Sequence, residues 1–110
     1  MSAINTGDLV RVMVQAAKSS LGDDWPEARK FVESESEKYA ESLKRIIIWQ
    51  QGGEIDEEEA NSLLRLHNRS MKMVLTAARG ISLKMAERAV NAALDAVRNT
   101  VNRAIGWQLL

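Results

Sequence analysis

The chain has 110 residues, which suits one domain with a modest core, and we expect residues 1–110 to form a single helical domain. Hydrophobic residues make up 45% and charged residues 27% of it, as in an ordinary globular protein, and the formal net charge is zero. There is no cysteine, which excludes disulfides, thiol catalysis and thiolate metal sites. With neither a secretory signal nor an apolar run of about 18 residues, we expect a cytoplasmic protein without a membrane span.

Charge is unevenly distributed along the chain. Residues 27–59 contain ten acidic and five basic residues, whereas residues 60–110 contain two acidic and eight basic residues. We interpret this as an acidic helix lying beside a basic one, within a bundle or across a symmetric interface. The alternative is a basic face for nucleic acid, although these basic residues are interspersed with apolar ones instead of being clustered.

The first predicted helix spans about residues 8–20. Apolar residues recur at helical spacing from Leu9 to Leu21, and Thr6 or Asp8 is placed to cap the helix. The turn at residues 19–23 then separates it from a second helix.

The second predicted helix spans about residues 25–51. Asp24 and Glu27 have the spacing of a capping box, Pro26 lies in the first turn, and Gly52-Gly53 ends the helix. Glu35-Ser36 interrupts the apolar stripe, so we expect the middle of this helix to lie at the edge of the core.

The third predicted helix spans about residues 57–79 and begins at a second capping box, Asp56 and Glu59. Gly80 then allows two interpretations. It can separate this helix from a fourth one at about 83–107, capped by Ser82, or it can lie inside one helix of about 50 residues.

An internal echo favours the break at Gly80. The stretch from Val10 to Gln50 resembles the stretch from Met71 to Gln108, and both end in Trp-Gln. The alignment needs a three-residue gap, and two amphipathic helices can also resemble each other by chance. We interpret the echo as two similar helical hairpins, whose first copy has a clear turn where the second has Gly80.

No residue pattern points to catalysis, a cofactor or a metal. His67, the only histidine, lies on an apolar stripe with no partner one turn away, which is typical of a core histidine. A di-iron site would need two Glu-x-x-His pairs, and Leu64 stands three residues before His67. The glycines follow no phosphate-binding spacing. We therefore expect a protein that is not an enzyme.

Large apolar residues gather at the ends of the second and fourth predicted helices. In an up-down bundle these helices run in the same direction, so both tryptophan-bearing ends lie together. Apolar groups at helix ends suggest a contact surface, against the simpler interpretation that they plug the end of the monomer. The candidate partner-binding residues are Ile48, Trp49, Ile105, Trp107, Leu109 and Leu110.

The sequence thus predicts an all-α, four-helix up-down bundle built from two similar hairpins. The alternative architecture fuses the third and fourth helices into one long helix of an intertwined dimer. The predicted function is a non-enzymatic interaction or assembly protein that forms a homodimer or larger oligomer. The alternative function is a nucleic-acid-binding module, although we expect nucleic acid to be the less favoured partner. Its candidate residues are Arg65, Arg69, Lys72, Arg79, Lys84 and Arg88.

Overall fold

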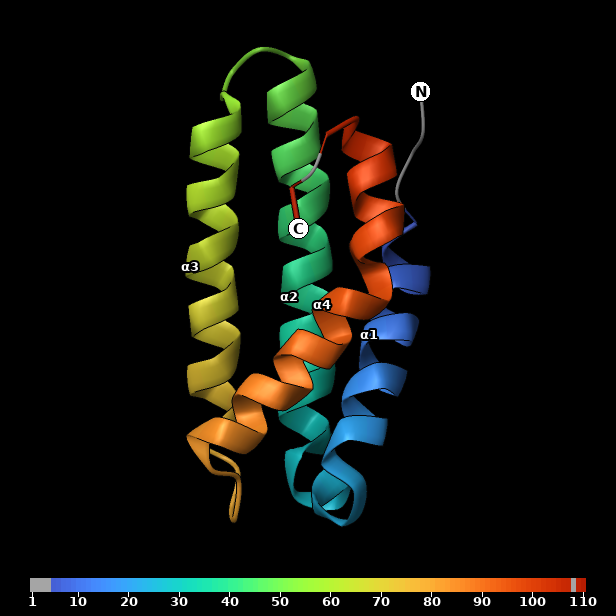
Figure 1. The fold of residues 1–110 in the computed structure, drawn as a ribbon, viewed down its shortest axis with the longest axis vertical. Helices are drawn as coiled ribbons and strands as arrows, with labels where there is room; N and C mark the ends of the chain where they lie inside the picture. Colours follow the sequence, from blue (N-terminus) through green and yellow to red (C-terminus); the bar gives the residue numbers. More distant parts are fainter. Residues whose placement is uncertain (1–4, 108) are drawn as a thin grey trace.

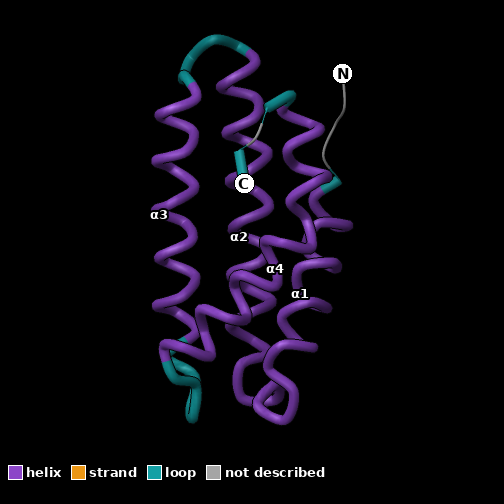
Figure 2. Tube along the Cα trace, viewed as in Figure 1, coloured by secondary structure: helices purple, strands orange, loops and turns teal. Residues whose placement is uncertain are grey.

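The computed structural model of the chain describes residues 5–107, 109 and 110. Its elements are α1 (Thr6–Leu21), the short 3-10 helix η1 (Gly22–Asp24), α2 (Trp25–Gln51), α3 (Glu57–Leu75) and α4 (Leu83–Ile105). Figure 2 shows that helices dominate the described chain, and none of its residues lies in a strand. The predicted all-α fold is confirmed.

The helices form an up-down bundle. Successive helices reverse direction. α4 crosses obliquely from the C-terminal end of α3 to the N-terminal end of α1 (Figure 1). Both α1 and α3 pack against α2 and α4, which closes a ring of four helices. The bundle measures 43 × 22 × 19 Å. Since residues 76–82 leave the helical path, the alternative with one fused long helix is wrong.

Local hydrogen bonds explain where α3 and α4 begin. Asp56 Oδ1 accepts from the backbone N–H of Glu59 at 2.8 Å, and Glu59 Oε1 accepts from the N–H of Asp56 at 3.2 Å. Ser82 Oγ accepts from the N–H of Met85 at 3.1 Å. These side chains satisfy amides that have no partner inside the helix, so both predicted caps are confirmed.

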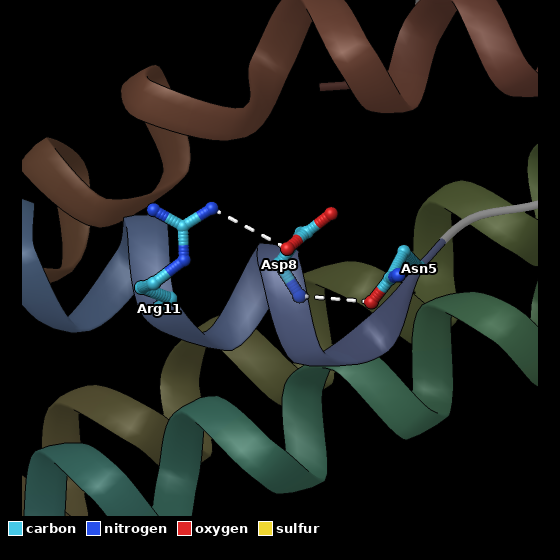
Figure 3. A network of polar contacts seen from close by, with 3 residues as sticks. All are labelled: Asn5, Asp8 and Arg11. Carbon is cyan, nitrogen blue, oxygen red and sulfur yellow. Dashed lines mark hydrogen bonds and ion pairs between the residues drawn. The ribbon is translucent and has the colours of Figure 1, made fainter.

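The predicted caps of α1 and α2 are wrong. Asn5 caps α1, because its Oδ1 accepts from the N–H of Asp8 at 3.0 Å, while Asp8 pairs with Arg11 at 3.3 Å (Figure 3). The helix therefore begins at Thr6, two residues before the predicted start. Asp24 makes no capping bond, because it belongs to η1, which leads directly into α2.

Two helices end earlier than predicted. α3 stops at Leu75 instead of residue 79, because Ala77 and Ala78 donate to carbonyls three residues back, which tightens the chain into turns. Gly80 then has φ +80°, and the reversal brings Ala78 and Ile81 into the core. α4 ends at Ile105 instead of residue 107, where Gly106 adopts φ +89°.

One core runs through the bundle, with contributions from all four helices. Small residues line the buried face of α4 and let its neighbours approach closely: Ala86, Ala89, Val90 and Ala93. The expectation that the middle of α2 lies at the edge of the core is wrong. Glu35 is 5% exposed and Ser36 is 1% exposed, because neighbouring helices cover this turn.

The internal repeat stays a prediction. In the echo, Val14 corresponds to Leu75, yet α1 continues to Leu21 whereas α3 ends at Leu75. The aligned stretches therefore differ in conformation after these residues. Within the described part of the chain, no helix is long and apolar enough to cross a membrane.

Candidate functional site

The C-terminal ends of α2 and α4 lie at the same end of the bundle (Figure 1). Much of the apolar surface at these ends is buried within the monomer. Ile105 is 7% exposed and Leu109 is 9% exposed, so both belong to the core. Trp49, Trp107 and Leu110 are half-buried. The indole N–H of Trp107 is buried without a hydrogen-bond partner in the described chain. Ile48, at 57% exposed, is the predicted contact residue that solvent reaches most freely.

The outward face of α3 comprises the exposed residues Ser62, Leu66, Arg69 and Met73, and it carries two large apolar side chains. Leu66 is 59% exposed and Met73 is 65% exposed, and their spacing of seven residues places them on one side of the helix. α3 forms one flank of the bundle in Figure 1 and packs mainly against α2 and α4. This face is therefore open along the length of the helix.

Sequence reasoning missed this face, although a signal for it was present. The buried positions of α3 are Ala60, Leu64, Met71 and Leu75. At 100° per residue, Leu66 and Met73 fall on the opposite side from this stripe. Large apolar residues off the core stripe are the pattern that identifies an exposed face.

The six candidate basic residues occupy three elements. Arg65, Arg69 and Lys72 lie on α3, Arg79 in the connection, and Lys84 and Arg88 at the start of α4. Lys72 is half-buried and the other five are exposed. None of the six forms an ion pair with any described residue. Arg65 lies near the middle of α3, and the other five lie between it and the second turn of α4 along the chain.

A groove of about 490 Å³ separates α2 from α3. It is lined by Glu35, Glu37, Lys38, Tyr39, Glu41, Ser42, Arg45, His67, Ser70 and Met71. The carboxylate of Glu35 lies at its inner side, where Lys38 Nζ approaches Glu35 Oε2 at 3.1 Å. Because Lys38 is mostly exposed, its ammonium group lies between this buried carboxylate and the solvent.

Tyr39 and His67 also border this groove. Tyr39 is buried, its hydroxyl has no hydrogen-bond partner in the described chain, and this burial raises the pKa of the phenol. The half-buried His67 comes near carboxylates of α2 that the sequence placed far away, but it pairs with none of them. The described residues contain no group of three or more potential ligands that could hold a metal. The geometry thus supplies polar contacts without an assembled catalytic group.

In comparisons with protein-family models, curated proteins and solved structures, the chain has no match.

Proposed function

We propose that the protein is a non-enzymatic assembly protein that self-associates through the outward face of α3. The observation that carries this proposal is the exposure of Leu66 and Met73 together on one face of a flanking helix. Single exposed apolar residues are normal, but two large ones on the same face of an open helix offer a partner two apolar contacts. This proposal moves the contact surface from the Trp49 and Trp107 end to α3.

The charge pattern of α3 supports a second copy as the partner. Its first turn carries Glu57, Glu58 and Glu59, whereas the basic Arg69 and Lys72 lie in its second half. When two copies of this helix pair in antiparallel fashion, the acidic end of each lies beside the basic half of the other. Such a pairing is closed by a two-fold axis, as in most homodimers.

The same antiparallel arrangement brings the exposed apolar side chains of the two copies into contact. Leu66 is the middle residue of α3, so a two-fold axis near it places Leu66 of both copies together. Met73 lies about 10 Å along the helix, beside the first turns of the other copy. Burying these side chains on association supplies the apolar driving force, and the charged ends set the direction of pairing.

The test is the mass in solution, measured by light scattering over a range of concentrations. We expect the unaltered protein to be a dimer, and the double variant Leu66→Lys/Met73→Lys to be a monomer with an unchanged helical circular dichroism spectrum. The matched control is Leu83→Lys, because Leu83 is 53% exposed but lies at the start of α4. A mass unaffected by the double variant, or equally reduced by the control, would contradict the proposal.

Nucleic-acid binding is the second candidate, favoured by six basic side chains without ion pairs among the described residues. It requires binding to DNA or RNA that weakens steeply as salt is added. A lack of binding at low salt would exclude it. Alanine at both Arg79 and Lys84 should weaken such binding, whereas the α3 variants above should keep it.

A further inference from the structure

The oblique path of α4 creates a second groove, between α3 and α4. The two helices are joined through residues 76–82 and diverge from there, and the last described residues of the chain turn back toward the opening between them (Figure 1). A volume of about 410 Å³ remains in this groove, within the range of ligand sites. It is lined by Asn61, Leu64, Arg65, Asn68, Asn91, Leu94, Arg98, Leu109 and Leu110.

Two facing rows of side chains form this groove. On α3, Asn61, Arg65 and Asn68 are four and three residues apart, so they share one side of the helix. On α4, Asn91 and Arg98 are seven residues apart and make a matching row. Each row spans about 10 Å, the length of about three residues of extended chain. Leu64 and Leu94 are buried and provide the apolar floor.

The last residues of the chain form one wall of this groove. Asn102 Oδ1 accepts from the backbone N–H of Leu109 at 2.8 Å and from that of Leu110 at 2.9 Å. The side chain of Leu109 is buried while its main chain is held by an asparagine. A non-helical segment with a buried leucine side chain thus already lies along one side of the groove, and the volume beside it is open.

The remaining part is equipped for more main chain of the same kind. A carboxamide both donates and accepts, so asparagine matches the N–H and C=O groups of an extended peptide. Asn61, Asn68 and Asn91 supply three such groups, and Asn68 Oδ1 is buried with no partner in the described chain. A bound peptide N–H would satisfy this oxygen.

Charge decides which peptide fits. Arg65 and Arg98 are the charged side chains of the described lining, and no acidic side chain is among the residues that line the groove. Arg98 pairs with Asp95, whereas Arg65 only donates to Ser62 Oγ at 3.1 Å and forms no ion pair with a described residue. An acidic side chain on the ligand would pair with the guanidinium of Arg65 through charge-assisted hydrogen bonds.

We propose that the groove between α3 and α4 is a docking site for a short extended segment of another protein that carries a leucine and an acidic side chain. The leucine enters where Leu109 now lies, the main chain runs between the asparagine rows, and the acidic group meets Arg65. The chain's own Leu109 competes for this site because it is tethered nearby at high effective concentration. This site is separate from the outward face of α3 and does not depend on self-association.

The test uses the full chain and a fluorescent synthetic peptide with one leucine followed by two glutamates. We expect weak binding to the unaltered protein and about tenfold tighter binding to Leu109→Ser, which removes the competing leucine side chain. Adding Arg65→Ala to Leu109→Ser should remove that gain, whereas adding Arg69→Ala should keep it, since Arg69 faces outward. Equal binding by all four proteins, or no binding, would overturn the proposal.

A second measurement on the unaltered protein does not depend on how well Leu109→Ser folds. Titrating the same peptide should shift the side-chain amide resonances of Asn61, Asn68 and Asn91 and reduce the exchange protection of the Leu109 backbone N–H. A peptide with lysines in place of the glutamates should shift them less. Equal shifts with both peptides, or shifts confined to other regions, would contradict the assignment of this groove to acidic segments.

Discussion

At the scale of single residues, the structure buries polar groups where the interrupted apolar stripe predicted the edge of the core. Glu35 and Ser36 interrupt the apolar stripe of α2, yet both are buried. Glu35 is accommodated because Lys38 lies one turn away and pairs with its carboxylate. Tyr39, on the next turn, is the only tyrosine of the chain, and its hydroxyl is buried without a partner in the described residues.

Tyr39 should make the stability of the protein depend on alkaline pH. Its pKa is raised by burial, whereas in the unfolded chain the phenol ionises near pH 10. The stability conferred by keeping the phenol neutral is therefore complete below about pH 10 and is lost as the pH rises above it. Urea unfolding at a series of alkaline pH values should show a falling midpoint.

The control for this prediction is Tyr39→Phe, which has nothing to ionise at this position. Since no hydrogen bond of the hydroxyl is lost, its stability at neutral pH should be within about 1 kcal/mol of the unaltered protein. Its alkaline loss of stability should be smaller. The same alkaline loss in both proteins would show that other groups cause it.

At the scale of elements, the connection between α3 and α4 rests on backbone conformation. Gly80 has φ +80°, a region that side-chain-bearing residues rarely adopt, and a Cβ there would meet no atom within 4 Å. Gly52 ends α2 with an ordinary φ of −82°. The two glycines thus differ in the reason for their presence, although both follow a helix.

Replacing each glycine by alanine separates these two roles. We expect Gly80→Ala to lower the free energy of unfolding by about 1 kcal/mol, because alanine is strained at positive φ. Gly52→Ala should leave it unchanged or slightly higher, since the unfolded chain loses conformational freedom and the native conformation is allowed. Chemical denaturation measures both, and equal effects would contradict the conformational explanation.

At the scale of the whole molecule, the break at Gly80 produces a compact shape. The longest dimension of 43 Å fits the bundle that the sequence predicted and excludes a rod of fused helices. Because α3 lies along one flank, pairing through it joins two bundles side by side (Figure 1). Pairing through the Trp49 and Trp107 end would instead join them end to end.

Small-angle X-ray scattering distinguishes these two dimers. Side-by-side pairing should increase the longest dimension only moderately, because the added copy widens the particle. End-to-end pairing should nearly double it. A dimer of nearly twice the monomer length would therefore favour the surface that the sequence predicted over the outward face of α3.

The sequence by itself determined the all-helical fold and several helix boundaries, whereas the structure decided between separate and fused third and fourth helices. Asp56 with Glu59, Ser82, and the glycines after α2 and α4 act through bonds and backbone angles within a few residues. Such short-range effects can be read from neighbouring letters. Hydrophobic periodicity likewise predicted the helical segments, because the apolar face of a helix is set by spacing alone.

Only the tertiary structure decided which surfaces stay open. The oblique path of α4, the burial of Glu35 and the placement of Leu109 depend on packing between residues far apart in the chain. Those contacts bury Ile105 and Leu109, which the sequence analysis had predicted to bind a partner. They leave Leu66 and Met73 exposed to solvent. The physical reason is that a side chain is buried only when a neighbouring element covers it. The sequence of one helix does not reveal which neighbour covers which of its faces.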